Sequence, residues 1–516
     1  MSLDLAFGIA RSGIARSGLL TTQRALAQVS HNLSNAATPG YTRKSADPQS
    51  VHQQGSPMGV RLGEARRNVD EALQAERHAR GGEAAGAAVR ERLLQSIEGV
   101  HGQPGDGQSL GDGFGAMRAA FVALRGSPAD GGMQREVVEA AREVASRLNQ
   151  ISAAVGDARQ QAQDGITQEV GRINSGLREI ADLTARIQGD RARGFATGEL
   201  EDMRDLALAR LSESLPLRAL HQEDGGLVLV TRGGLGLPMD PARDAFSTAG
   251  ASLGPQAFYG AGGTLPGVML GGQDVTRQLA GGRLGEMIAL RDTTLPRFQA
   301  ELDLAAAHLA SRFDGQGLRL FTGSSGQVPD VTLAYSNPAA GLMGFANEIR
   351  LNPAVAANPA LLRDGTQAVT ATAGGPTAFT PNPAGGPQGF AVLLDRVLDH
   401  ALGETVAPNT PWAVLPGAGL GPDGTLASPF VTPRGIEAYA GLLTGAHTAD
   451  RASATAVRER AEGLKRGLDA RFQSESGVNT DAELAALVQL QNAYAANARV
   501  MSTAQQMWDS LLNMAR

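Results

Sequence analysis

Histidine and cysteine are the residues best suited to nucleophilic or metal chemistry, and their distribution in this sequence favours neither. The chain of 516 residues contains no cysteine, so it offers no thiolate nucleophile, no disulfide and no cysteine-ligated zinc. None of its histidines stands in an H-E-x-x-H pattern. They are scattered at positions 31, 52, 78, 101, 221, 308, 400 and 447. We therefore expect no metal site.

Other patterns that resemble catalytic motifs are equally weak. The glycines of residues 417–421 do not have the spacing of a dinucleotide fingerprint, and residues 323–326 (GSSG) lack the spacing of a nucleophile elbow. The acidic pair Glu201–Asp202 falls on a predicted helix surface, where such pairs usually form a solvated face. The sequence predicts no catalytic residue, no cofactor-binding residue and no enzyme activity.

Composition points to long helices instead. Glycine is abundant, with 66 residues, while aromatic residues make up 4% and charged residues 19% of the chain. This balance suits Ala- and Leu-rich helices joined by glycine loops, and the length predicts two to four domains. The net charge of −6 without a long basic run argues against a nucleic-acid partner.

The chain shows no signal for membrane insertion. No stretch reaches the roughly 20 apolar residues of a transmembrane helix. The N-terminus lacks a basic region, and Arg11 interrupts its apolar run, so we expect no cleaved signal peptide.

Apolar residues recur every three or four positions over several long segments, which predicts a mainly α fold. The longest segment, 134–188, would form a single helix of about 80 Å, far beyond the usual globular length. Residues 226–240 predict a short β-hairpin. The other predicted helices span 3–36, 70–100, 114–124, 199–215 and 283–313 (with a break or kink near Pro296), and long helices resume near 436 and continue to the chain end.

Residues 325–435 depart from this pattern because helical periodicity mostly disappears there. We expect an inserted Gly/Pro-rich domain, either α/β or β-containing, with one short helix near 390–402. Its most Gly/Pro-rich stretch, 371–390, is predicted to be a surface loop with few core contacts.

The C-terminal helix carries a heptad seam with almost no charge around it. Between 484 and 512 the only charged residues are Arg499 and Asp509, and a helix so nearly uncharged all round is expected to pack on several sides. The best partner within the chain is the N-terminal helix, and self-assembly with other copies would cover the rest. The seam positions are Leu484, Leu487, Gln491, Tyr494, Ala498, Met501, Gln505, Trp508 and Leu512.

Residues 30–44 (SHNLSNAATPGYTRK) end the N-terminal helix. Their Asn and Ser side chains compete for backbone hydrogen bonds, Pro39 disfavours helical geometry before it, and Gly40 accepts positive φ. This stretch also resembles the N-terminal signature of bacterial flagellar axial proteins, the rod, hook and hook-associated subunits. Ala37 stands where the family more often has Asn. The matching residues are Asn32, Leu33, Ser34, Asn35, Ala36, Thr38, Pro39, Gly40 and Tyr41.

The C-terminus resembles the partner signature of the same family. Within the family, the S-G-V-N of residues 476–479, the Q-N-A-Y of 491–494 and the helix sequence of 127–150 favour a subunit of the hook–filament junction. The alternative is another axial protein, such as hook-associated protein 3 or a hook subunit. Residues of the C-terminal signature present here are Gln491, Ala493, Tyr494, Ala496, Arg499, Val500 and Thr503.

The resemblance implies a long helical bundle with terminal coiled-coil helices from both chain ends. Residues 1–45 and 476–516 would form the inner coiled-coil domain, 46–324 and 436–475 the bundle, and 325–435 an outer domain. Implied partners are copies of the chain in a ring, hook protein, hook-associated protein 3 and an export chaperone. The location would be extracellular, in the flagellum, after type III export.

Two other classes of protein fit less well. An enzyme such as a peptidoglycan hydrolase would need a carboxylate or Cys/His constellation in the insert, which shows none. A coiled-coil adhesin or scaffold would lack the T-P-G-Y stop paired with the Q-x-A-Y helix.

Overall fold

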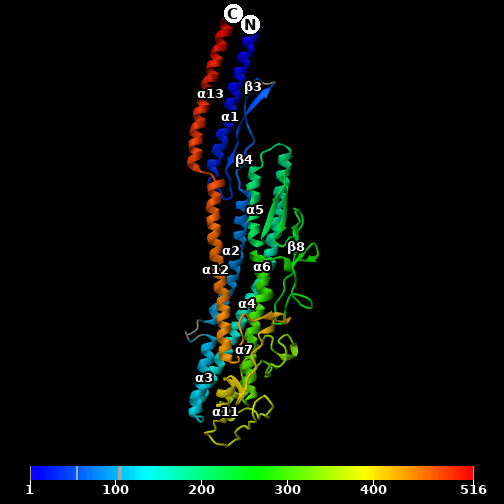
Figure 1. The fold of residues 1–516 in the computed structure, drawn as a ribbon, viewed down its shortest axis with the longest axis vertical. Coiled ribbons are helices and arrows are strands. Elements are labelled where there is room, and N and C mark those ends of the chain that lie inside the picture. The colour runs from blue at the N-terminus through cyan, green and yellow to red at the C-terminus, as the bar shows by residue number, and fades with distance from the viewer. Residues whose placement is uncertain (1, 54–55, 103–106, 108, 515–516) are drawn as a thin grey trace. The chain divides into compact units, whose positions relative to one another are not determined.

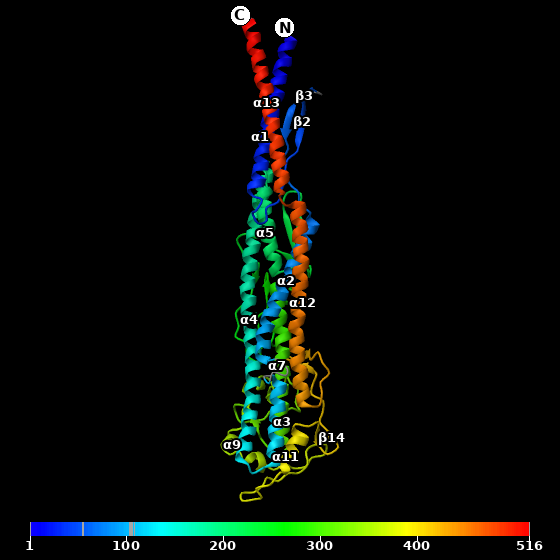
Figure 2. The same ribbon diagram turned by 90° about the vertical axis from the view of Figure 1, so that its left-hand side faces the viewer.

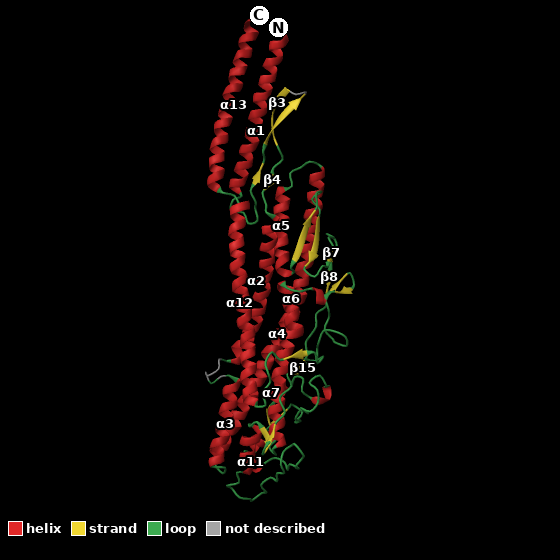
Figure 3. Cartoon of the chain, in the orientation of Figure 1, coloured by secondary structure: helices red, strands yellow, loops and turns green. Residues whose placement is uncertain are grey.

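The structure, a computed structural model, describes residues 2–53, 56–102, 107 and 109–514. It divides into two compact units: unit 1 comprises Met1–Ala84, Arg172–Ala245 and Arg460–Arg516, and unit 2 comprises Ala85–Gly171 and Phe246–Glu459. Helices dominate both units and the strands are short (Figure 3), which confirms the predicted mainly α fold. Among the described residues, no helix is long and apolar enough to span a membrane.

Three long helices contribute residues to both units. They are α2 (Glu71–His101), α4 (Gly131–Ala192) and α12 (Ile436–Ser476). The apolar period of three to four residues continues without a proline through α4, and this explains why it forms one uninterrupted helix of 62 residues. The three domains predicted from the sequence are a different division of the chain, and that division remains a prediction.

In unit 1, the two terminal helices run side by side in opposite directions (Figures 1 and 2). These are α1 (Ser2–Ser34) and α13 (Thr480–Met514). The hairpin of β2 (Pro48–Gln53) and β3 (Ser56–Leu62), which was not predicted, lies against α1. The Val60 N–H donates to Ser17 Oγ at 3.1 Å, and Thr21 Oγ1 donates to the Val60 carbonyl at 2.9 Å.

The rest of unit 1 surrounds α5 (Gly198–Ser214). Strand β1 (Lys44–Ser45) pairs antiparallel with β4 (Arg66–Arg67). A three-stranded antiparallel sheet follows α5, in the order β5-β6-β7. The predicted hairpin at 226–240 contains β6 and β7, whereas β5 begins so soon after α5 that the pattern hid it. The three strands are β5 (Leu217–His221), β6 (Leu227–Thr231) and β7 (Gly236–Leu237).

Unit 2 is built around α7 (Leu295–Gly315), which is buried on nearly every side. Helix α6 (Gly282–Ala289) leads into it through a π-helical turn, η2 (Leu290–Thr294), so the predicted break lies just before Pro296. Helix α3 (Leu110–Gly126) is capped by Ser109, whose side chain accepts from the Asp112 N–H.

Residues 325–435 belong to unit 2 and are fastened to α7 by a buried carboxylate. Asp303 accepts hydrogen bonds from Tyr335 Oη, the Gly344 N–H and the Ala346 N–H, each at 2.8 Å. The small elements of unit 2 are β8 (Phe246–Ser247), β9 (Met269–Leu270), β10 (Gln273–Asp274), η1 (Thr276–Gln278), β11 (Phe321–Thr322), η3 (Pro338–Ala340), α8 (Phe345–Glu348), β12 (Arg350–Leu351), α9 (Pro353–Ala357), α10 (Leu361–Asp364), α11 (Val392–Arg396), η4 (Val397–Ala401), β13 (Thr405–Ala407), β14 (Thr410–Pro411), β15 (Ala418–Leu420) and β16 (Leu426–Ala427).

The stretch 371–390 is mostly exposed, as predicted, but it has one core contact that its composition does not suggest. Phe379 is buried and forms an isolated β-bridge with Val369. The Arg396 guanidinium lies 5.4 Å from the centre of the Phe379 ring and donates to Thr377 Oγ1 at 2.5 Å. One aromatic residue therefore anchors a loop whose composition suggests only surface. The short helix predicted at 390–402 corresponds to α11 and η4, whereas α8, α9 and α10 are too short to show periodicity.

Candidate assembly site

The N-terminal motif forms a series of tight turns that reverses the chain. The Asn35 N–H donates to the His31 carbonyl, the Thr38 N–H to the Asn35 carbonyl, and the Tyr41 N–H to the Thr38 carbonyl, at 3.1, 2.9 and 3.1 Å. Gly40 has φ of +80°, a conformation that is unfavourable for residues with a Cβ. The segment after the turn therefore runs back beside the end of α1.

Asn32 is the centre of this turn. It is almost fully buried, and its Oδ1 accepts from Tyr41 Oη at 2.9 Å and from the Lys44 N–H at 3.2 Å. Its Nδ2 donates to the Lys44 carbonyl at 2.9 Å and to Glu483 Oε2 at 3.3 Å. All four hydrogen-bonding positions of the amide are thus used, which accounts for an asparagine at this position.

Tyr41 closes the turn from outside. Its hydroxyl also lies 3.0 Å from His31 Nδ1, and Lys44 Nζ lies 3.6 Å from the centre of its ring. Burial, reinforced by the negative charges of Asp202, Glu199 and Glu483, raises the pKa of Tyr41 to about 12. The phenol therefore stays protonated and remains a donor to Asn32.

Glu483 joins the N-terminal turn to the C-terminal helix. Its side chain is fully buried in the first turn of α13 and accepts from Arg43 Nε at 2.6 Å as well as from Asn32. The Arg43 N–H donates to the carbonyl of Ser476, the last residue of α12, at 2.8 Å. Sequence reasoning missed Glu483, because an acidic residue in a first helical turn is common for its interaction with the helix dipole.

The pair Glu201–Asp202 is not a solvated face, and that prediction was wrong. Asp202 is buried and accepts from three side chains: Lys44 Nζ at 2.5 Å, Thr42 Oγ1 at 2.6 Å and Arg67 Nε at 3.0 Å. Lys44 and Arg67 are paired neighbours on β1 and β4, so the short ladder presents both cations to one side of α5. The N-terminal turn is thereby fixed to α5 as well as to α13.

Two other acids of α5, Glu201 and Asp205, also have cationic partners. Arg67 also pairs with Asp205 and, at 3.3 Å, with Glu201, and Arg191 pairs with Glu201 at 3.0 Å. Burial by itself would lower the pKa of Arg67, but the charges of Asp205 and Asp202 outweigh it and raise that pKa. Each carboxylate of the cluster therefore has a cation against it.

The seam of α13 that faces α1 differs in part from the predicted one. Contacts to α1 include Glu483 with Asn32, and Asn497, whose Nδ2 lies 3.5 Å from Thr22 Oγ1. These two residues are two heptads apart, one position before the predicted Leu484 and Ala498. Of the predicted residues, Leu487, Ala498 and Met501 are partly buried; Leu484, Gln491, Tyr494, Gln505 and Trp508 are exposed; and the side chain of Leu512 lies outside the described residues.

Large apolar side chains of α13 remain exposed away from α1. The exposed fractions are 47% for Leu484, 54% for Val488, 57% for Val500 and 58% for Met507. At about 100° per residue, the first two lie close together on one flank of the helix and the last two on another. With α1 on a third side, α13 has two apolar flanks without a partner in the described chain.

The remaining residues of the N-terminal motif contact nearby residues of the turn or are exposed. Leu33 and Asn35 are partly buried, and Thr38 and Pro39 are exposed. The Asn35 side chain donates to the His31 carbonyl at 3.0 Å, and Thr38 Oγ1 donates to Asn35 Oδ1 at 3.3 Å. The motif thus serves the turn itself, and Pro39 remains free on its outside.

Two of the scattered histidines meet in the core of unit 2. His101 Nε2 lies 2.9 Å from His447 Nδ1, and His447 Nε2 lies 2.8 Å from Glu301 Oε2. Burial lowers the pKa of both histidines to about 3 and raises that of Glu301 to about 7. No group of three or more His, Asp or Glu among the described residues could hold a metal ion.

Comparisons with known proteins also point to flagellar proteins. A family model described as the helical domain of flagellar hook-associated protein FlgK matches residues 94–327, and the model of the C-terminal region of flagellar basal body rod FlgEFG proteins matches residues 470–514. Flagellar hook-associated protein 1 of Bacillus subtilis (strain 168) is 22% identical over 527 residues, covering 97% of each chain.

Two further relatives are similar. Flagellar hook-associated protein 1 of Salmonella typhimurium is 22% identical over 556 residues, covering 97% of this chain and 99% of the relative. The solved structure of the flagellar hook junction protein FlgK from Burkholderia pseudomallei is 21% identical, with a TM-score of 0.40 over 49% of this chain and 45% of that one.

Proposed function

This chain belongs to the family of flagellar hook-associated protein 1, whose members are structural proteins of the bacterial flagellum, and we propose that it forms the junction between hook and filament. In this proposal, copies of the chain assemble side by side into a ring. The ring contacts hook protein on one side and hook-associated protein 3 on the other. The chain is a building element and catalyses no reaction.

The exposed apolar flanks of α13 carry the proposal. Burying apolar side chains that are about half exposed, on two sides of one helix, requires two neighbours in addition to α1. A single partner would cover only one flank. Neighbouring copies on both sides supply the needed pair of surfaces, and repeated contacts of this heterologous kind close into a ring or continue as a helix.

The residues of the two signatures take different parts in this assembly. We assign Asn32, Asn35, Thr38, Gly40 and Tyr41 to the turn that holds α1 against α13. Pro39, on the outside of that turn, is free for contacts between copies, and Leu33 packs within it. The seam residues that face away from α1, led by Leu484, form the contact between copies together with Val488.

Export and location follow from the family in this proposal. The chain leaves the cell through the flagellar type III pathway without a cleaved signal peptide. A flagellar chaperone holds it before export, and it ends outside the cell in the flagellum.

A second candidate is another axial subunit, such as hook-associated protein 3 or a hook subunit. The C-terminal match at residues 470–514 is to a region described for rod-type proteins, so the terminal helix by itself fits any axial subunit. The match at residues 94–327 is to the helical domain of the hook-associated protein and favours the junction.

A deletion strain tests the two candidates. If the chain forms the junction, cells lacking it should make hooks without filaments, and filament protein should accumulate in the medium. Cells lacking a hook subunit would make no hooks. Normal filaments on the deletion strain would contradict both assignments, and a plasmid copy of the chain is the control that should restore swimming.

A further inference from the structure

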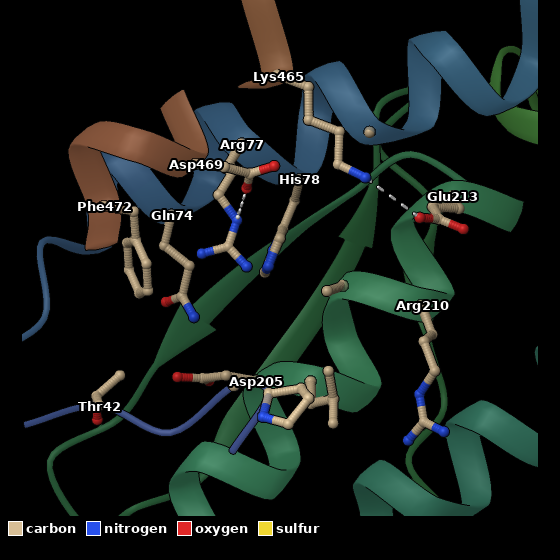
Figure 4. A pocket seen from close by; sticks show the side chains of 15 residues that line it. Thr42, Gln74, Arg77, His78, Asp205, Arg210, Glu213, Lys465, Asp469 and Phe472 are labelled. Carbon is tan, nitrogen blue, oxygen red and sulfur yellow. Dashed lines mark ion pairs between the residues drawn. The ribbon is translucent and has the colours of Figure 1, made fainter. Parts of the chain in front are cut away.

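Unit 1 contains a cavity that no side chain of the described chain fills. It has a volume of about 340 Å³ and lies between α2, α5 and α12 beside the N-terminal turn (Figure 4). Its lining includes Gln74, His78, Leu206, Ala209 and Phe472. Its rim reaches Gly40, so the cavity adjoins the motif described above.

The charged groups of the cavity wall already have partners. Arg77 Nε lies 2.9 Å from Asp469 Oδ1, and Lys465 Nζ lies 3.8 Å from Glu213 Oε1. Arg210 pairs with Glu179 at 2.9 Å. The wall therefore presents no unpaired charge, and it suits a neutral occupant rather than an ion.

Two neutral polar side chains point into the cavity without a partner. Gln74 is 7% exposed and His78 Nε2 is fully buried, and neither side chain has a hydrogen-bond partner among the described residues. They stand four positions apart on α2, so they share one face, and Figure 4 shows both directed toward the cavity. Burial, with the nearby charge of Arg77, lowers the pKa of His78 to about 4, so the imidazole is neutral. An unpaired buried polar group is costly, which indicates an occupant that forms hydrogen bonds.

Two adjacent glycines of α2 differ in whether close packing requires them. A Cβ on Gly82 would lie 2.6 Å from the Ser212 carbonyl oxygen, so glycine is needed there. A Cβ on Gly81 would meet only Lys465 Cε at 3.8 Å and Glu213 Cγ at 4.0 Å. Gly81 lowers helix stability without relieving any clash, and its effect is to keep the cavity open.

The loop between α4 and α5 offers a matching group. Phe195 is 61% exposed, although aromatic side chains are usually buried. The Phe195 carbonyl and the Ala196 N–H have no hydrogen-bond partner among the described residues. An exposed ring next to free peptide groups complements a cavity whose wall includes the apolar residues Leu206, Ala209 and Phe472 together with a free amide and imidazole.

We propose that the cavity receives Phe195 and its adjoining peptide group from a neighbouring copy of the chain. The ring packs against Leu206, Ala209 and Phe472, and Gln74 and His78 bind the peptide group. Because Phe195 is not among the residues that line the cavity, the contact joins two different patches of the chain, so it is heterologous and links copies head to tail. This inference rests on the proposed function, since it supplies one of the contacts between copies.

Disulfide cross-linking in flagella tests the contact, because the natural sequence has no cysteine. Two differently tagged chains are expressed together in the deletion strain, one with Phe195→Cys and the other with Ala209→Cys. After oxidation of purified flagella, a covalent dimer carrying both tags is expected. Leu220→Cys, exposed on β5 and outside the cavity lining, replaces Ala209→Cys as the matched control and should give no dimer.

The outcomes separate this contact from the proposed function. Flagella that contain both tagged chains but yield no mixed dimer would overturn the contact and leave the proposed function standing. Absence of both chains from flagella that still assemble would overturn both proposals. Gly81→Leu, which fills the cavity, gives a second measurement: the mixed dimer should be lost while the melting temperature of the isolated chain does not fall. An unchanged yield of dimer in Gly81→Leu would also contradict the contact.

Discussion

The side-chain amide of Asn32 lies 3.3 Å from Glu483 Oε2, although 451 residues separate the two in the sequence. The hydrogen bond joins the last turn of α1 to the first turn of α13. The N-terminal motif is therefore complete only when the C-terminal helix is in place. This gives the elaborate end of α1 a purpose beyond stopping a helix: it fixes both ends of the chain to each other.

A double-mutant cycle should detect this link. Asn32→Ala and Glu483→Ala each remove one partner of a buried hydrogen bond, so the coupling energy should be about 0.5–3 kcal/mol. Urea unfolding can be followed by the fluorescence of Trp508 on α13 in a Trp412→Phe background. Asn35→Ala is the matched control, because its side chain bonds within the turn and not to Glu483. Additive effects for Asn32 and Glu483 would contradict the link.

Substitution of Asp202 should destabilise unit 1 more than most substitutions there. Asp202→Ala leaves Lys44 without its buried anion and removes one of the three carboxylates that pair with Arg67, and breaking a buried ion pair in this way costs about 3–5 kcal/mol. Hydrogen exchange of α5 should rise accordingly. Glu179→Ala removes an exposed partner of Arg210 on the same unit and should change stability by less than about 1 kcal/mol. Equal effects of the two substitutions would show that the Asp202 cluster is not a stabilising one.

Helical periodicity predicted most of the fold because long helices reveal themselves over many turns. Helix α4 and the terminal helices follow their predicted spans to within a few residues. The hairpin β2–β3 was missed because it depends on packing against α1, and helices α8 to α10 were missed because they are too short to show a period. Phe379 shows the same limit, because one buried ring in a Gly/Pro-rich loop leaves no periodic signal.

The sequence predicted the turn of the candidate site but not the residues that the turn binds. The types and spacing of Asn32, Gly40 and Tyr41 marked the turn, but their partners lie far away in sequence. In the sequence Asp202 and Glu483 have the pattern of ordinary surface acids, because their partners Lys44 and Arg43 are distant along the chain. Polar Glu483 and Asn497 contact α1, whereas apolar Leu484 is exposed, so a heptad of apolar residues does not mark the positions that face α1. The role of the predicted seam in assembly remains a prediction.

The His101–His447 pair should make unit 2 sensitive to acid. The folded pKa of His447 is about 3, against an ordinary value of 6.5, so between these values the unfolded chain binds the extra proton. Stability should therefore fall as pH is lowered from about 6.5 to 3, by about 1.4 kcal/mol per pH unit for each such histidine. Glu301 has the opposite effect, because its pKa is raised to about 7 in the folded chain. Between pH 4.5 and 7 the folded chain holds the proton of Glu301, so this residue makes stability fall as pH rises.

The variant His447→Gln isolates this effect. Its unfolding free energy should depend less steeply on pH below 6 than that of the natural chain, as measured by urea unfolding at several pH values. His52→Gln, at an exposed position on β2, is the control and should leave the dependence unchanged. If His447→Gln retains the full slope, the buried pair does not exchange protons on unfolding as described.

Substitutions at two neighbouring residues of α13 distinguish a contact between copies from packing within the chain. Val488 is exposed on a flank away from α1, whereas Leu487 is partly buried on the seam toward it. Val488→Asp should leave the melting of the isolated chain unchanged, because its carboxylate stays in water there. In the assembled state the same carboxylate would be buried without a partner, at a cost of several kcal/mol. Swimming should therefore be lost, and filament protein should appear in the medium.

Leu487→Asp should behave differently, because it places a charge between α1 and α13 in the isolated chain. Both the protection of α13 from hydrogen exchange and swimming are expected to fall. The comparison is decisive in either direction. If Val488→Asp cells swim normally, the flank at Leu484 and Val488 is not a contact between copies. If Val488→Asp instead unfolds the isolated chain, that flank is covered within the chain, and the need for neighbours on both sides of α13 disappears.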